Sequence, residues 1–198
     1  MTKLTRVGAF VFAICLAISS ASAATYSESS NGDLSGNRAA PTAFNLTAGG
    51  NLLTATTQSG DIDVVRINVP AGNNLAQLFV RSFTQAGFDS TAFMGIQQGS
   101  TFTVDPNIAG PTELLGYAHF SPAFVNFDIL PGMGTAFDTI GYTPPLAAGN
   151  YTLFLQQLGT PVTYSLDFIV RPVPEPATLV LGGFGLAFVL VVGRRKRR

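Results

Sequence analysis

The sequence predicts an all-β domain, an antiparallel β-sandwich or jelly roll, with a signal-peptide helix at its N-terminus and a transmembrane helix at its C-terminus. Between residues 44 and 171, short apolar stretches recur at regular intervals, separated by Gly, Pro, Asn and Asp. No part of this region shows a sustained helical stripe of apolar residues. With both ends set aside, the 198 residues leave room for one domain with a sizeable core.

Residues 1–23 have the pattern of a secretory signal peptide, which signal peptidase removes. Its parts are a charged start (Lys3, Arg6), a short apolar stretch (Ala9–Ile18) and a small-residue cleavage site (Ala21, Ala23, Ala24). Cys15 leaves open a lipoprotein, although Ile14 stands where that processing requires a small residue. Cleavage after Ala23 leaves a mature chain without cysteine, which excludes disulfides and thiolate catalysis.

Charge is segregated along the chain, because both ends are basic and the middle is acidic. Residues 24–173 hold four basic side chains against ten acidic ones. Nucleic-acid binding requires a basic face that neutralises phosphates. The sequence therefore argues against a nucleic-acid partner.

The domain is expected to begin after a flexible lead-in, residues 24–43, which is rich in Ser, Gly and Asn and shows no periodicity. Residues 44–171 then form the sandwich. In Ile62–Val69, apolar and polar residues alternate, which predicts a half-buried strand. Leu75–Phe83 is apolar on both faces, which indicates a central strand.

A β-hairpin is predicted near the end of the domain. Tyr151–Leu158 and Tyr164–Val170 both alternate, and a Gly-Thr-Pro turn separates them. Weaker strands are expected over Asn51–Thr57, Ala92–Gln97, Thr101–Val104, Leu114–Ala118 and Ala123–Ile129.

Two kinds of enzymatic chemistry are considered, one based on a catalytic histidine and one on a pair of carboxylates. His119 is the only histidine, and neither a nucleophile nor an orienting acid stands near it in sequence, so we interpret it as a strand-end or turn residue. A glycosidase would use two carboxylates, and no spacing selects a pair. The acids available are Asp61, Asp63, Asp128 and Asp138. We expect no enzymatic activity and keep a secreted glycan hydrolase as the alternative.

Asp61 and Asp63 flank Ile62, so both carboxylates are expected on the same side at the mouth of a strand. Hard cations such as Ca²⁺ bind several such oxygens. The other explanation of the pattern is a turn whose aspartates accept backbone hydrogen bonds. Because no EF-hand loop or Gly-Asp repeat is present, we favour the turn and expect no cofactor, with calcium as the alternative.

Carbohydrate binding is a further alternative for the domain, and it commonly uses aromatic platforms. The chain has no tryptophan, and most of its Phe and Tyr residues fall on expected core faces. Core packing is therefore the preferred interpretation of these side chains.

The C-terminus has an apolar run, Ala177–Val192, followed by a basic cluster. A helix of this length covers about 24 Å, less than the roughly 30 Å of a bilayer core. The cluster is expected to stay cytoplasmic, which places the acidic domain outside the cytoplasm. Its members are Arg194, Arg195, Lys196, Arg197 and Arg198.

Three alternating prolines precede this run and hold the backbone extended, in a form that a protease can grip. The motif Pro174-Glu175-Pro176, then the apolar span, then the arginine cluster resembles the PEP-CTERM sorting signal of Gram-negative bacteria. The resemblance implies that a membrane-embedded exosortase recognises residues 172–198 and cleaves near the motif. In that family such proteins usually accompany exopolysaccharide and biofilm formation. An ordinary single-pass anchor is the alternative.

The middle of the chain has a fainter likeness to the bacterial pre-peptidase C-terminal β-sandwich domain. The matching segments are residues 61–67, 88–90 and 146–153. This resemblance implies the sandwich fold. It does not carry over a calcium site, because Gln97-Gln98-Gly99-Ser100 replaces the family's acidic turn.

These observations together predict an exported surface or extracellular-matrix protein without enzymatic activity. It is expected to be anchored transiently in the inner membrane and then to reach the cell surface or the medium. Extracellular polysaccharide is a candidate partner.

Overall fold

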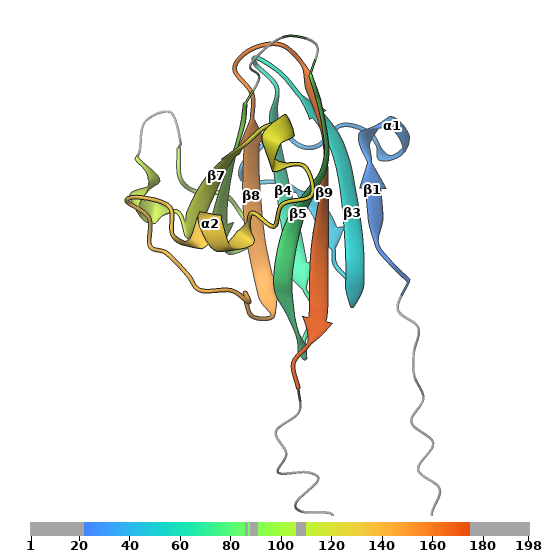
Figure 1. The fold of residues 1–198 in the computed structure, drawn as a ribbon, viewed down its shortest axis with the longest axis vertical. Coiled ribbons are helices and arrows are strands. Elements are labelled where there is room, and N and C mark those ends of the chain that lie inside the picture. The colour runs from blue at the N-terminus through green and yellow to red at the C-terminus, as the bar shows by residue number, and fades with distance from the viewer. Residues whose placement is uncertain (1–21, 86, 88–90, 106–109, 175–198) are drawn as a thin grey trace, which may run out of the picture.

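The computed structural model describes residues 22–85, 87, 91–105 and 110–174. These residues form two β-sheets that pack face to face (Figure 1). The predicted signal-peptide and transmembrane helices, with Ala21 and the basic cluster Arg194–Arg198, lie outside the described residues. No helix within the described ranges is long and apolar enough to cross a membrane.

The first sheet has four strands in the order β1-β3-β9-β5. They are β1 (Thr25–Ser27), β3 (Gly49–Thr57), β9 (Val162–Pro172) and β5 (Asn73–Gln85). β9 pairs antiparallel with β3 on one side and with β5 on the other, and β1 adds to β3 in parallel at the edge. The C-terminal strand is therefore at the centre of this sheet.

The second sheet has five strands in the order β2-β4-β8-β6-β7. They are β2 (Thr42–Asn45), β4 (Ile62–Val69), β8 (Gly149–Gln156), β6 (Ala92–Gln98) and β7 (Gly116–Phe120). All pairs are antiparallel except β2 with β4, which is parallel.

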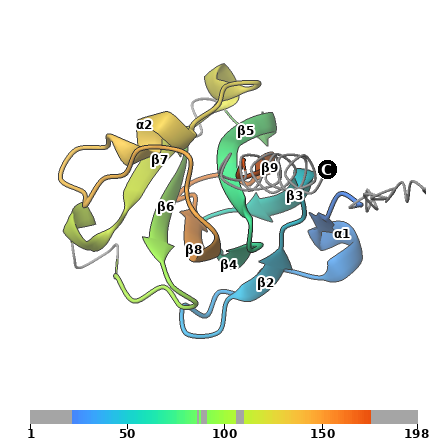
Figure 2. The same ribbon diagram turned by 90° about the horizontal axis from the view of Figure 1, so that it is seen from below.

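The helices are single turns in the connections. They are α1 (Glu28–Asn31), η1 (Pro111–Glu113), η2 (Pro122–Phe124) and α2 (Leu130–Gly134). Figure 2 shows α1 beside β3 and β2, at the side where the two sheets meet, and α2 beside β7.

The core lies between the sheets, where alternate residues of each strand point inward. Leu53, Leu166 and Phe168 of the first sheet and Val65 and Ile67 of the second are all buried in it. A smaller cluster covers the outer face of the five-stranded sheet. Its buried members are Val64, Phe102, Val104, Leu114 and Phe154.

The prediction of an all-β sandwich is confirmed, but the predicted hairpin is wrong. β8 pairs with β4 and β6, whereas β9 pairs with β3 and β5, so the two strands belong to different sheets. The turn at Gly159-Thr160-Pro161 crosses from one sheet to the other. Alternation predicts that a strand has one buried face and does not specify its partner.

The predicted lead-in also differs from the structure. Residues 25–27 form β1, which pairs with β3, and Ser35 forms a bridge with Val64 of β4. Leu34 is buried among the core residues. The Ser, Gly and Asn residues of this segment make turns and backbone contacts, so their composition does not indicate flexibility here.

Two of the weaker predicted strands are absent as strands. In residues 101–104, Phe102 and Val104 are buried, as alternation suggests, but the segment is not part of a sheet. Residues 123–129 contain η2 and two single bridges to β5, at Val125 and Asp128.

Candidate functional site

Asp63, near the start of β4, faces the space between the two sheets and has no exposed surface. Its Oδ2 accepts a hydrogen bond of 2.8 Å from the hydroxyl of Tyr164, a fully buried residue of β9. This bond joins the two sheets. Asp63 Oδ1 has no hydrogen-bond partner among the described residues.

Two further acids come from the segment that follows β1. This segment leads from β1, at the edge of the first sheet, to β2, at the edge of the second (Figure 2). Glu28 of α1 accepts hydrogen bonds from the backbone N–H groups of Leu34 and Thr56, and it is half-buried. Asp33 is exposed.

Glu28, Asp33 and Asp63 form what we call the acidic cluster. One carboxylate oxygen of each lies within 4.8 Å of those of the other two. The two ion pairs of the described residues, Arg38–Asp105 and Arg81–Asp167, involve none of these acids.

Burial perturbs the ionisation of two acids of the cluster. Burial raises the pKa of Asp63 to about 8; the hydrogen bond from Tyr164 opposes this rise and the nearby acids add to it. Burial also raises the pKa of Glu28, against the two backbone hydrogen bonds that lower it. The folded chain therefore disfavours full ionisation of the cluster unless positive charge is supplied.

Of the two aspartates predicted from the sequence as calcium candidates, the structure places only one in the acidic cluster. Asp63 belongs to the cluster, whereas Asp61 is outside the group of three, although its charge contributes to the raised pKa of Asp63. Glu28 and Asp33 were missed, because they lie in the segment expected to be flexible. No local pattern relates them to Asp63, which is some thirty residues further on.

The other acids proposed for a carboxylate pair lie elsewhere. Asp128 Oδ1 accepts hydrogen bonds from the backbone N–H groups of Leu78 and Leu130, so it closes a turn. Asp138 is exposed in a loop with a φ of 59°.

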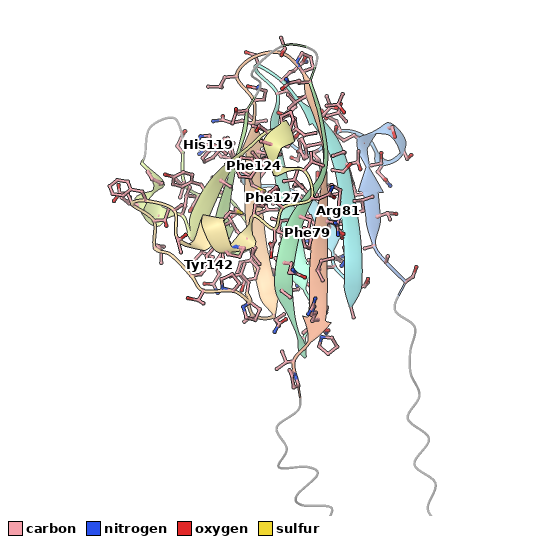
Figure 3. All side chains as sticks on the ribbon, viewed as in Figure 1. Phe79, Arg81, His119, Phe124, Phe127 and Tyr142 are labelled. Atoms are coloured by element: carbon pink, nitrogen blue, oxygen red, sulfur yellow. The ribbon has the colours of Figure 1, made fainter. Side chains whose placement is uncertain are left out.

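An aromatic patch occupies the outer face of the five-stranded sheet; it consists of Phe93, Tyr117 and His119. Phe93 stacks on Tyr117 with ring centroids 5.9 Å apart, and His119 makes edge contacts with both rings. Val104, Gly110, Pro111 and Leu114 complete the lining of a pocket of about 250 Å³ with these three residues. His119 is exposed, and Phe124 and Phe127 lie near it (Figure 3). His119 is thus a strand residue in aromatic surroundings.

The two ends of the described chain emerge at the same end of the sandwich. Thr25 of β1 pairs with Leu52 of β3, which pairs with Asp167 of β9, and β9 ends five residues later (Figure 1). Ala24, expected to become the mature N-terminus, donates its backbone N–H to Asn51 Oδ1. Val173 N donates to Gly72 O at 2.8 Å.

The described residues therefore define an all-β sandwich whose central strand β9 leads directly into a C-terminal tail. The family model of the PEP-CTERM protein-sorting motif matches this tail, residues 172–198. The match confirms the resemblance read from Pro174-Glu175-Pro176 and the segments after it. The chain carries the sorting motif of PEP-CTERM proteins, which implies export and processing by an exosortase.

A search of curated proteins and a search of solved structures each found no match to this chain. The likeness of the middle to the pre-peptidase C-terminal domain stays a prediction.

Proposed function

We propose that the protein is a non-enzymatic surface or extracellular-matrix protein, whose sandwich is delivered outside the cell after an exosortase cleaves near Pro174-Glu175-Pro176. The observation that carries this proposal is the sorting motif at residues 172–198. Signal peptidase acts first, after Ala23. The short apolar span then holds the chain in the inner membrane until the exosortase acts.

The end of β9 supports cleavage at this position. The ladder of the sheet ends at Pro172, and the side chains of Val173 and Pro174 are exposed. A protease can therefore bind the chain from Pro174 onward without removing a strand from the sandwich.

The burial and hydrogen bonding of the candidate carboxylates support a role without catalysis. A carboxylate pair must reach both sides of a glycosidic bond. Asp63 has no exposed surface, so it is not available to a sugar, and Asp128 Oδ1 is engaged by two backbone N–H groups. The alternative, a secreted glycan hydrolase, requires two acids that face a shared cleft.

Mass spectrometry of the protein from its host, with and without the exosortase, tests the proposal. We expect the mature form to begin at Ala24 and, in the strain with exosortase, to lack the arginine tail. Glu175→Ala should retain the tail, and Glu113→Ala, a change of the same kind at an exposed position, should be processed normally. A tail retained in both strains would leave a plain membrane anchor as the explanation.

Polysaccharide binding is a second candidate, favoured by the aromatic patch. Stacked, partly exposed rings bind the apolar faces of sugars, and the pocket beside Phe93 and Tyr117 is wide enough for part of one. Co-sedimentation with exopolysaccharide from the host should be reduced by Tyr117→Ala. Phe137→Ala removes an equally large ring at an 84% exposed position elsewhere and serves as control. Equal binding by both variants would count against the patch.

A further inference from the structure

The acidic cluster requires an explanation that the sorting motif does not supply. Asp63 is wholly buried, and its Oδ1 lacks a hydrogen-bond partner among the described residues. Leaving a buried polar atom without a partner is costly, and buried charges are normally paired or bound to a metal. Glu28 and Asp33 each place a carboxylate oxygen within 4.8 Å of one of Asp63 and bring further negative charge.

We propose that Glu28, Asp33 and Asp63 bind one Ca²⁺ ion between the two sheets. Oxygens on opposite sides of a calcium ion are roughly 5 Å apart, so carboxylate oxygens within 4.8 Å of one another suit a single ion. Backbone carbonyls or water complete the six to eight ligands that calcium takes. Mg²⁺ is a poorer candidate, because it keeps several waters and is usually held by one or two carboxylates.

The graded exposure of the three acids provides a route for the ion. Asp33 is exposed, Glu28 is half-buried and Asp63 is buried, so a cation can meet solvent-exposed oxygen before it reaches the interior. Asp63 is held in place by the hydrogen bond that its Oδ2 accepts from the Tyr164 hydroxyl. Glu28 is held by the backbone N–H groups of Leu34, in the same segment, and of Thr56 in β3.

The bound ion would connect three parts of the fold. Glu28 and Asp33 belong to the segment that links β1 to β2, Asp63 belongs to β4, and Tyr164 extends the contact to β9. Calcium therefore fastens the N-terminal segment to both sheets. This role rests on the acidic cluster and on the buried, unpartnered Asp63 Oδ1, and it does not depend on exosortase processing.

Terbium luminescence tests the site directly, with the full-length protein purified in mild detergent and stripped with EDTA. Tb³⁺ replaces Ca²⁺ at oxygen sites and emits when energy passes to it from a nearby aromatic ring. The chain has no tryptophan, and Tyr164 is one hydrogen bond from Asp63. We expect tyrosine-excited terbium emission that Ca²⁺ abolishes by competition and Mg²⁺ at the same concentration does not.

Asp33→Asn and Asp63→Asn should each weaken terbium binding by about tenfold or more, because each removes one negative ligand. Asp33→Asn is the decisive variant, since its side chain is exposed and the fold does not rely on it. Asp138→Asn, at another exposed position, is the matched control and should bind as the wild type does. Absent emission, emission displaced equally by Mg²⁺, or unchanged affinity in Asp33→Asn would overturn the proposal.

Hydrogen exchange gives an independent readout on the same samples. We expect Ca²⁺ to slow amide exchange in peptides covering residues 24–36 in the wild type and in Asp138→Asn, and not in Asp33→Asn. Exchange that Ca²⁺ leaves unchanged in the wild type would contradict a bound ion at this position.

Discussion

Asp63 occupies an inward-facing position of β4, and the next two inward-facing positions carry the apolar side chains of Val65 and Ile67. An aspartate is almost never fully buried unless it has a partner. Here the partner is Tyr164, a residue of the opposite sheet, so one polar contact joins the sheets inside an apolar core.

Tyr164→Phe should destabilise the protein. The change leaves the ring in place and removes the only hydrogen bond that the described residues make to the Asp63 carboxyl, so we expect the free energy of unfolding to fall by about 1–3 kcal/mol. Urea denaturation followed by circular dichroism measures it. Tyr117→Phe, on the outer face, should change stability by less than about 0.5 kcal/mol. Similar losses in the two variants would contradict an energetic role for the bond.

The raised pKa of Asp63 predicts a pH dependence of the cation-free protein. In the unfolded chain this carboxyl loses its proton near its ordinary pKa of 3.8, and in the folded chain near 8. Between these values the folded state binds more protons, so the free energy of unfolding falls as the pH rises. Glu28 and Asp61, whose pKa values are also raised, act in the same direction.

Urea denaturation in EDTA at several pH values between 4 and 8 measures this slope. Asp63→Asn cannot titrate at this position and should show a shallower dependence than the wild type. Parallel curves for the two proteins would mean that Asp63 ionises normally in the folded state.

At the scale of elements, the sequence predicts where strands lie better than how they pair. The strands at 62–69 and 75–83 were predicted nearly at their observed positions, the first from alternation and the second from apolar residues on both faces. The prediction that the second is a central strand is wrong, because β5 is the last strand in the order of its sheet. The pairing of β8 and β9 was predicted wrongly, because a short turn can join neighbours in one sheet or cross between two.

The acidic cluster was not predicted from the sequence, for a related reason. Asp63 was recognised from its place in an alternating strand, but Glu28 and Asp33 follow a strand of only three residues that pairs with β3. Glu28 and Asp33 come close to Asp63 because of the path that the chain takes between the two sheets. No local spacing in the sequence indicates this path.

The short helix α2 offers a test of close packing between elements. A methyl group on Gly134 would collide with the backbone carbonyl oxygen of Tyr142, which a side-chain rotation cannot relieve. Gly134→Ala should therefore lower the free energy of unfolding by about 2 kcal/mol or more. Gly132→Ala, in the same helix, meets nothing within 4 Å and should be neutral or slightly stabilising. Thermal melts of the two variants compare them, and a neutral Gly134→Ala would contradict the tight contact.

At the scale of the whole molecule, the described chain leaves the sandwich at one end, through the start of β1 and the end of β9 (Figure 1). Both segments that are expected to meet the membrane, the signal peptide and the C-terminal span, are joined to that end. Cleavage near Pro174 would release the sandwich with all its strands.

Truncations of the tail test whether the sandwich is independent of its sorting signal. A chain that ends at Pro174 keeps β9 and the bond from Val173 N to Gly72 O, so its melting temperature should stay within about 2 °C of the full-length value.

A chain that ends at Asp167 loses Phe168 and Val170 from the central strand, both buried. Burial of these two side chains contributes about 3–6 kcal/mol, comparable with the whole stability of a small domain. We expect no cooperative melting of the shorter chain by circular dichroism. If ending the chain at Pro174 abolished melting as well, the sorting segment would be part of the fold, and its removal at the surface could not yield the protein that we propose.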